Sequence, residues 1–262
     1  MHEARLQATS GRELRELGDG ALLLDPIDPE PYWNRLVALD WPDDRREFDR
    51  RLDAAITVFS TLGRRPHVWS LPSLNHPADL VDRLVAAGFE VMGSDRLMLQ
   101  ADVAPTQDRV AQPNPAGLTV VRLHGLSAVS IRWAPDVAAV LADAFGVNEE
   151  RRLSIELETL AALENLTVTI VLLLSDGEPV AVAKRSTLAG VSYLSSIGTR
   201  LARRRQGLGG LVTAIAAGDA IEAGSDRTYL KVDIDNRDAQ RLYERLGFRA
   251  VPGQIDDLLI RS

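Results

Sequence analysis

The feature that most constrains this chain is a segment rich in glycine and arginine, Ile197–Leu211, which separates a strand-like run from a helical pattern. Before it, Val191–Ser196 combines β-branched and aromatic residues in the way typical of a strand. After it, Leu211–Gly224 places its apolar side chains on one helical face. We therefore predict a strand, a loop and the N-terminus of a helix in immediate succession.

The chemistry of this loop suits phosphate oxygens. Guanidinium groups pair with phosphate, and glycines let the backbone approach a ligand with successive N–H groups. A helix N-terminus adds about half a positive charge and unpaired N–H groups. These features predict a pyrophosphate-binding loop, although a glycine-rich turn beside a solvated basic cluster would fit the loop alone equally well. The residues concerned are Arg200, Arg203, Arg204, Arg205, Gly207, Gly209 and Gly210.

Three families of glycine loop compete for this segment. A Walker A loop needs Lys and then Ser or Thr after its second glycine, whereas Gly210 and Leu211 follow Gly209 here. A dinucleotide fingerprint would need glycine or alanine at the position of Val212. The run Arg204–Gly209, which includes Gln206, Gly207 and Leu208, instead fits [Q/R]xxGx[G/A] and resembles the acyl-CoA signature of the GNAT superfamily of N-acetyltransferases.

A second motif follows in the order and spacing that this resemblance requires. The strand-like run Thr228–Asp235 leads into NRDAQRLYERLGF, residues 236–248, which resembles the NxxAxxxYxxxGF segment that ends GNAT domains. The matching residues are Asn236, Ala239, Tyr243, Gly247 and Phe248. The loop and this segment together cover about the last quarter of the chain.

The N-terminal half resembles the latter part of a GNAT domain without its functional residues. A helix, a strand, a helix, Gly-Phe and a strand occur there as they do at the C-terminus, and Gly88 precedes Phe89 as Gly247 precedes Phe248. Such spacing indicates an internal repeat. However, Trp41–Glu47 has no glycine where the phosphate loop would lie, and Leu84 occupies the position of Tyr243. An unrelated α/β cap remains the alternative.

The predicted fold is α/β (α+β), with a GNAT-type mixed and mostly antiparallel sheet flanked by helices, in a tandem GNAT-like arrangement. We expect a degenerate partial domain at 1–105, a Pro-rich linker at 106–117 and the acetyltransferase domain at 118–262. In the latter the patterns predict a strand at Leu118–His124, helices at Ala134–Phe145 and Glu149–Leu163, and strands at Thr167–Leu174 and Pro179–Ser186. Two strands are expected after Gly247.

Composition excludes several classes of protein. The 262 residues contain no cysteine, so neither a disulfide framework nor a cysteine nucleophile is possible. The net charge of −7 argues against a nucleic-acid partner, and no apolar run is long enough to span a membrane. The charged N-terminus has no apolar signal region. We expect a cytoplasmic protein, monomer or homodimer, with no metal, since no cluster of histidines and carboxylates has ligand spacing.

The resemblance implies an acyl-CoA-dependent N-acyltransferase that transfers acetyl from acetyl-CoA directly to a primary amine in a ternary complex. It assigns acetyl-CoA binding to the strand end and the phosphate loop, and a possible contact with the pantetheine arm to Asn236, whose first role is to cap the following helix. The cofactor-binding residues are Ile197, Gly198, Thr199, Arg204, Arg205, Gln206, Gly207, Leu208, Gly209, Gly210 and Asn236.

Tyr243 is the candidate catalytic acid, because a phenol near the sulfur can protonate the departing thiolate. The alternative is a tyrosine half-buried beside Phe248, with its hydroxyl on a backbone carbonyl. The sequence names no general base. Val191–Thr199 contains no carboxylate, and the only candidates, Asp233, Asp235, Glu149 and Glu150, are better explained as solvated surface carboxylates than as catalytic groups. A non-catalytic CoA-binding sensor or partner-binding module is therefore the alternative function.

Overall fold

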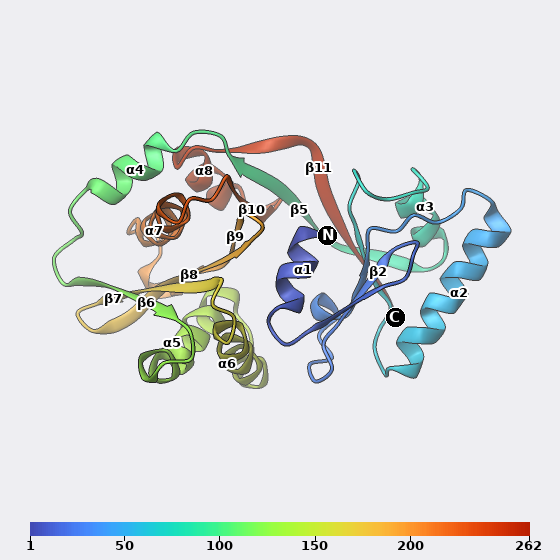
Figure 1. Ribbon diagram of the computed structural model, residues 1–262, viewed down its shortest axis with the longest axis horizontal. Helices are drawn as coiled ribbons and strands as arrows, with labels where there is room; N and C mark the ends of the chain where they lie inside the picture. The colour runs from blue at the N-terminus through green and yellow to red at the C-terminus, as the bar shows by residue number, and fades with distance from the viewer. The chain divides into compact units, whose positions relative to one another are not determined.

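The computed structural model describes residues 1–262 and separates into two compact units, which are described in turn (Figure 1). Unit 1 comprises residues 1–97, 232–235 and 250–262, and unit 2 comprises residues 98–231 and 236–249. None of the helices is long and apolar enough to cross a lipid bilayer.

Unit 2 is built on a sheet with the strand order β10-β9-β8-β7-β6. Neighbouring strands from β6 to β9 are antiparallel, whereas β9 and β10 are parallel. These strands are β6 (Leu118–His124), β7 (Val168–Ser175), β8 (Glu178–Leu188), β9 (Val191–Thr199) and β10 (Arg227–Asp233). The helices are α4 (Ala104–Ala111), α5 (Ala128–Phe145), α6 (Glu149–Leu163), α7 (Leu208–Glu222) and α8 (Arg237–Arg245).

Helices cover both faces of this sheet. Figure 1 shows α5 and α6 on one face and α7 on the other. Between α5, α6 and the sheet lies an aliphatic core in which Leu163, Val168 and Leu172 are fully buried. Burial of this kind contributes about 25 cal/mol per Å² of apolar surface, which makes the α5–α6 layer a stable support for whatever lies on the strands beneath it.

Unit 1 has the strand order β1-β2-β3-β4-β11-β5. Its core is formed by one face of the long helix α2 and by side chains of α3 and the strands, including Phe48, Phe59 and Leu84. The elements are α1 (His2–Ala8), β1 (Glu13–Glu16), β2 (Ala21–Leu24), β3 (Arg35–Val37), α2 (Arg45–Thr61), β4 (His67–Ser70), α3 (Leu80–Ala86), β5 (Phe89–Gln100) and β11 (Phe248–Arg261).

The tandem, mixed α/β architecture predicted from the sequence is confirmed. The order α2, β4, α3, β5 in the first half repeats as α7, β10, α8, β11 in the second half. Both copies also begin with a parallel strand pair, β3 with β4 and β9 with β10. Gly88 and Gly247, which follow α3 and α8, both have left-handed φ values, +87° and +89°, that only glycine adopts easily.

Three local predictions differ from the structure. Helix α5 starts at Ala128 with Ser127 as its cap, so Pro135 lies inside the helix rather than at its start. Two strands were expected after Gly247, and a single strand, β11, is found. Helix α4 covers the first half of the predicted linker, residues 106–111. Its eight residues show no apolar periodicity in the sequence, because Thr106 is the one residue among them that is buried. Thr106 donates a hydrogen bond to the carbonyl oxygen of Leu246.

Helix α4 also explains the glycine inside α7. A Cβ at Gly218 would lie 3.3 Å from the Cγ2 of Val110, so the missing side chain makes room for α4. Glycine inside a helix costs roughly 1 kcal/mol relative to alanine, and here the contact between α4 and α7 offsets that cost. The segment between the two halves of the chain is thus packed on unit 2 as far as Ala111.

The C-terminal strand completes the sheet of unit 1. Residues 257–260 of β11 pair antiparallel with β4, with Asp257 opposite Ser70 and Leu259 opposite Val68. The sequence placed these residues in the C-terminal domain, because chain order is the only guide that a sequence offers to domain membership. In the structure residues 250–262 cluster with unit 1 instead.

A buried polar cluster lies beside β4 in unit 1. Arg35 is 1% exposed and stacks on the rings of Tyr32 and Trp69. The Nδ1 atom of His67 lies 2.6 Å from the carbonyl oxygen of Pro31, and its Nε2 atom is buried without a hydrogen-bond partner. Burial, helped by the positive charges of Arg35 and Arg65, lowers the pKa of His67 to about 4.

This cluster predicts a loss of stability in mild acid. His67 binds a proton near pH 6.5 in the unfolded chain but only near pH 4 in the folded one, so the free energy of unfolding should fall as the pH drops through this interval. The full effect is about 3 kcal/mol, because one pKa unit corresponds to about 1.4 kcal/mol. Urea unfolding at a series of pH values would measure it.

The variant His67→Asn offers the test, since its amide keeps a donor near Pro31 and does not titrate. We expect the pH dependence between 6.5 and 4 to flatten in this variant. The control is His76→Gln, at a half-exposed histidine of the same unit, which should keep the wild-type slope. An unchanged slope in His67→Asn would assign the acid sensitivity to other groups.

Candidate functional site

Strand β9 separates from β10 halfway along its length. The two strands are paired in parallel from Val191 opposite Arg227 to Leu194 opposite Leu230, and the pairing ends there. On its other side β9 continues to pair with β8 up to Thr199. Backbone groups of Ser195–Thr199 on the β10 side are therefore available to a ligand.

A bulge lies at this point of β9. The pairing with β8 shifts register between Val182 and Lys184, opposite Ser196, whose φ of +49° is unusual for a residue with a side chain. Beyond the bulge, Gly198 lies under α5: a Cβ there would be 3.0 Å from the Cβ of Ala144. Only glycine lets the strand pass this close to the helix.

Helix α7 begins without a cap from the chain itself. Gly207 at its N-cap position has a left-handed φ of +77°, and no side chain accepts a hydrogen bond from the first turn. The first helical bond runs from Leu211 N to Gly207 O. Five consecutive N–H groups donate no hydrogen bond within the chain, and they belong to Gln206, Gly207, Leu208, Gly209 and Gly210.

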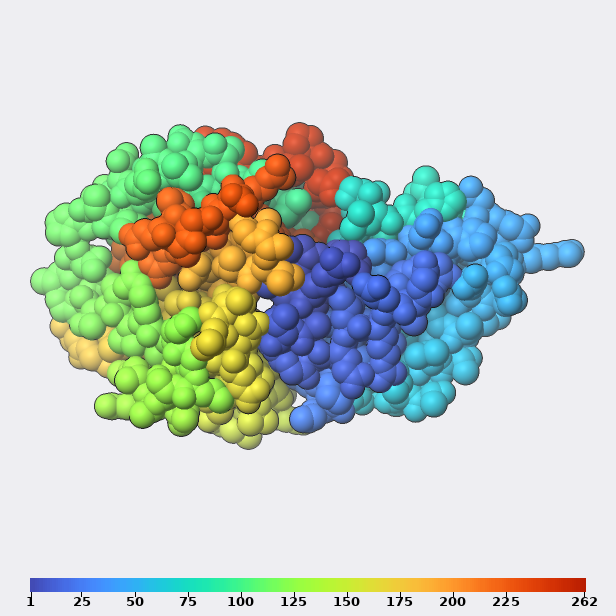
Figure 2. Space-filling view, viewed as in Figure 1, coloured from blue at the N-terminus to red at the C-terminus, as the bar shows by residue number.

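The strand end and the helix start lie against each other. A Cβ at Gly209 would be 3.2 Å from the Oγ1 atom of Thr199, closer than most side-chain contacts. The glycine therefore keeps the backbone of α7 accessible where it meets β9. Figure 2, in the same view as Figure 1, shows orange residues of α7 at the molecular surface.

The arginines of the loop have different partners. Arg203 forms an ion pair with Glu178 at 2.8 Å, and Arg200 donates to the carbonyl oxygen of Pro179 at 2.6 Å. Arg204 donates to the carbonyl oxygen of Ala144 at 2.7 Å, which ties the loop to the end of α5. Arg205 is exposed, has a φ of +62° and forms no such bond. Of the four arginines expected to crowd the loop, Arg205 is free, and the other three form bonds that hold the loop in shape.

The two residues singled out in the second motif have different roles. Asn236 caps α8, its side chain accepting a hydrogen bond from the N–H of Ala239 at 3.1 Å, which is its expected first role. Tyr243 is buried, 7% exposed, with its ring edge-on to Phe248. Burial raises the pKa of Tyr243, so the phenol keeps its proton at neutral pH. Its hydroxyl makes no hydrogen bond with the chain, contrary to the alternative of a carbonyl partner.

These residues suit a ligand with anionic oxygens and an extended chain. The N–H groups at the start of α7 lack acceptors, and anionic oxygens are acceptors that a helix N-terminus favours. The backbone of β9 beyond Leu194 offers the hydrogen bonds of an unpaired strand edge to an extended chain. No group of three or more histidine, aspartate or glutamate side chains lies close enough together to hold a metal ion.

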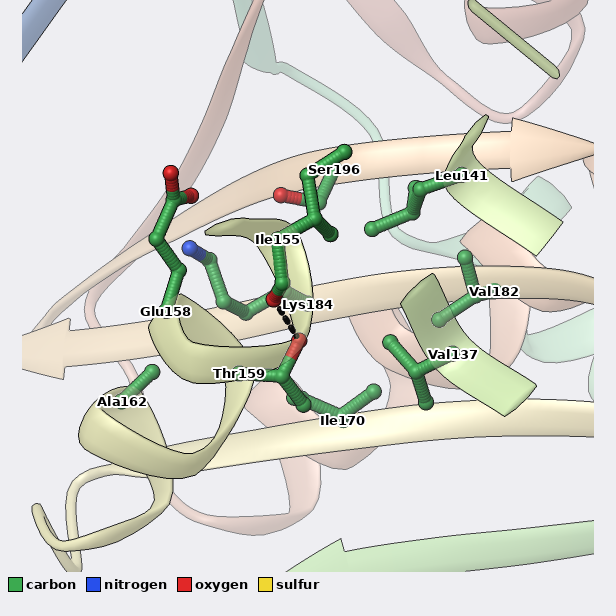
Figure 3. Close-up of a pocket in the computed structure, with 10 residues that line it drawn as sticks. All are labelled: Val137, Leu141, Ile155, Glu158, Thr159, Ala162, Ile170, Val182, Lys184 and Ser196. Atoms are coloured by element: carbon green, nitrogen blue, oxygen red, sulfur yellow. Dashed lines mark hydrogen bonds between the residues drawn. The ribbon is translucent and has the colours of Figure 1, made fainter. Parts of the chain in front are cut away.

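A pocket opens between the sheet and the helices α5 and α6, next to the bulge (Figure 3). Aliphatic side chains form most of its wall, and Glu158, Lys184 and Ser196 provide its polar groups. The sequence analysis missed these three residues. The composition gave a weak indication for Lys184: it and Lys231 are the only lysines among the 30 lysine and arginine residues.

The carboxylates considered as bases lie in ordinary surface positions. Glu149 forms an ion pair with Arg152 at 2.6 Å in the first turn of α6, and Asp233 accepts a hydrogen bond from the N–H of Asp235 in a turn. The pairing with Arg152 lowers the pKa of Glu149. None of these contacts points to a role in proton transfer.

Comparison with known proteins agrees with this geometry. The model of the acetyltransferase (GNAT) family matches residues 134–248, from α5 to the first residue of β11. None of the curated proteins matches the chain.

Solved structures resemble almost the whole chain. A GCN5-related N-acetyltransferase from Kribbella flavida is 25% identical, with a TM-score of 0.70 over 98% of this chain and 95% of that one. A conserved protein of unknown function from Staphylococcus epidermidis is 14% identical, with a TM-score of 0.71 over 97% and 94%. A tandem GNAT protein from the clavulanic acid biosynthesis pathway is 16% identical, with a TM-score of 0.64 over 99% and 87%. The last two establish the fold only.

The uncapped start of α7 generates a prediction for Gly209→Asp. A carboxylate there would occupy the N–H groups that phosphate needs and would repel its charge, while the helix N-terminus tolerates it. We expect the affinity for CoA, measured by calorimetry, to fall at least about 100-fold, or roughly 2.7 kcal/mol. Gly93→Asp, where a side chain meets open space, is the control and should bind normally. Equal affinities would remove the helix start from the site.

Proposed function

Because residues 134–248 form a domain of the acetyltransferase (GNAT) family, we propose that this chain is an acyl-CoA-dependent N-acyltransferase. It transfers an acetyl group from acetyl-CoA directly to a primary amine while both are bound. The observation that carries the proposal is the row of five N–H groups from Gln206 to Gly210, which have no acceptor within the chain.

The start of α7 binds the pyrophosphate in this proposal. The five N–H groups and the helix dipole supply donors and partial positive charge, and Arg205 adds a guanidinium that no other group uses. Arg204 contributes less directly, since its bond to Ala144 keeps the loop in place. We assign to Asn236 a contact with the pantetheine arm, made while its side chain keeps the capping hydrogen bond from Ala239.

The free edge of β9 orients the acyl group. Bound acetyl-CoA supplies an activated thioester, whose carbon accepts a nucleophile and whose sulfur leaves. Backbone groups of Ile197, Gly198 and Thr199 pair with the pantetheine arm as a neighbouring strand would, and an N–H near the bulge polarises the carbonyl. The strand edge and the α7 start are adjacent, as the contact between Gly209 and Thr199 requires.

Tyr243 is assigned the role of general acid. Its raised pKa keeps the phenol protonated, and its hydroxyl has no acceptor in the chain to compete with a departing thiolate. The acceptor amine loses its proton to solvent, since β9 carries no carboxylate. Transfer is direct because the chain has no cysteine for a thioester intermediate.

A non-catalytic CoA-binding sensor remains the second candidate. The observation that favours it is the lack of a carboxylate on β9 together with the surface positions of Glu149 and Asp233. The two functions share the phosphate loop and differ in whether Tyr243 takes part in chemistry.

The first half of the chain is not assigned a second CoA site. Helix α2, which corresponds to α7, is capped by Asp44, whose side chain accepts a hydrogen bond from the N–H of Glu47 at 3.0 Å. The N-terminus of α2 therefore already has its acceptor and two negative charges, which repel phosphate. Leu84, at the position of Tyr243, is fully buried in the core of unit 1.

The role of Tyr243 is tested by Tyr243→Phe, which keeps the ring and removes only the proton donor. Thiol release in the presence of an amine acceptor should fall by roughly 10²–10⁴-fold, while affinity for acetyl-CoA stays the same. Tyr229→Phe, at a tyrosine that stacks on Tyr193, is the matched control. Full turnover in Tyr243→Phe would exclude it as the acid, and tight binding without turnover in the wild type would favour the sensor.

The difference between α2 and α7 predicts one acetyl-CoA per chain. A calorimetric titration of the full chain should saturate at a ratio of one, and Gly209→Asp should abolish that single event. Saturation at two per chain, or one remaining binding event in the Gly209→Asp variant, would mean that unit 1 also binds the ligand.

A further inference from the structure

A carboxylate at the end of α5 is bonded to the backbone of the loop between β9 and α7. Asp143 accepts a hydrogen bond from the N–H of Leu201 at 2.6 Å. Leu201 is the first residue of η2 (Leu201–Arg203), a 3₁₀ turn within this loop. The residue at the N-cap position of the turn, Arg200, makes no side-chain capping bond. Asp143 therefore caps the turn from another element, 58 positions earlier in the chain.

The place of Asp143 in α5 works against the helix. Asp143 lies in the last turn, since α5 ends at Phe145, and the dipole of a helix disfavours a negative charge there. The stability of α5 therefore gives no reason for a carboxylate at this position. The reason is the bond to Leu201, because an ionised acceptor makes shorter and stronger hydrogen bonds than a neutral one.

The loop that this bond holds contains strained backbone immediately before α7. Arg205 has a φ of +62°, which is unfavourable for a residue with a side chain and persists where surrounding contacts hold the chain. Gly207 is also left-handed, and Leu208 after it is helical. Neighbouring residues of opposite hand direct successive N–H groups into one anion-binding concavity. The geometry of the N–H row therefore depends on how the preceding loop is held.

Asp143 holds the loop from a rigid support. Helix α5 is anchored in the core of unit 2 by buried residues such as Leu141. The ion pair between Arg203 and Glu178 is partly exposed, and exposed pairs contribute little to holding a segment in place. The bond from Asp143 instead fixes a backbone N–H group directly, at the start of the turn that leads to Arg205 and α7.

We propose that Asp143 is a positioning residue of the CoA site. By capping η2 from α5, it holds the loop in the form in which the N–H groups of Gln206–Gly210 converge on the pyrophosphate. This inference rests on the proposed function. The carboxylate acts through the loop and is not itself a ligand, because a negative charge repels phosphate.

The sign of the effect separates positioning from electrostatics. Removing a negative charge near a phosphate site would by itself raise the affinity for CoA. Asp143→Ala also removes the acceptor of Leu201, and in calorimetric titration of the full chain we expect its affinity for CoA to fall at least about tenfold, because a loop that is no longer held must be ordered on binding. Asp143→Asn keeps an oxygen that accepts the same bond and should bind CoA at least as tightly as the wild type. Asp136→Ala, two turns earlier in α5, is the matched control and should bind normally.

Hydrogen exchange of the ligand-free chain provides a second readout. The N–H groups of Arg203 and Arg204, which bond within the turn, should exchange faster in Asp143→Ala than in the wild type. The assignment is overturned if Asp143→Ala binds CoA as tightly as the wild type, if Asp143→Asn loses as much affinity as Asp143→Ala, or if affinity falls without faster exchange in the loop. These results leave the proposed function standing, whereas a wild-type chain that binds no CoA overturns both.

Discussion

The site depends on backbone groups for which the chain supplies no partner. A buried or crowded N–H group needs an acceptor, and most proteins give the first turn of a helix a side-chain cap. At the start of α7 five successive N–H groups have none, and next to them β9 leaves its parallel neighbour after Leu194. In the proposed function, a ligand that brings its own acceptors fills both gaps. A side chain at Gly209 would meet Thr199 between the two segments, and one at Gly198 would meet Ala144 of α5.

In the first half of the chain, the helix that corresponds to α7 has a side-chain cap at its N-terminus. Helix α2 follows the strand of a parallel pair as α7 does, but Asp44 caps it and Glu47 adds a second negative charge. The difference between a binding helix start and a structural one is therefore one capping carboxylate in place of a glycine. In unit 1 the position of Tyr243 is taken by Leu84, which contributes its whole side chain to the core. Positions that are assigned to binding in unit 2 thus have structural roles in unit 1.

Much of the fold could be read from periodicity and motif. Helix α6 has the predicted limits, and most strands of both units match their apolar runs, because a side chain's burial follows directly from its position in a local repeat. Helix α4 could not be found in this way, since its contacts with α7 depend on residues more than a hundred positions away. The transfer of residues 250–262 to the sheet of unit 1 has the same cause: strand pairing is a long-range choice that leaves no local pattern.

For the candidate site, the sequence by itself predicted the glycine- and arginine-rich loop and Tyr243, because each belongs to a motif contained in one segment of the chain. The tertiary structure alone decided which arginine is free, since Arg200 and Arg203 have partners at the start of β8 and Arg204 has one on α5. It also decided the pocket, whose charged groups come from α6 and β8 and meet only through the packing of helix on sheet. Site residues that lie within one segment could be predicted from the sequence. Sites built from residues of several segments depend on how those segments pack against one another.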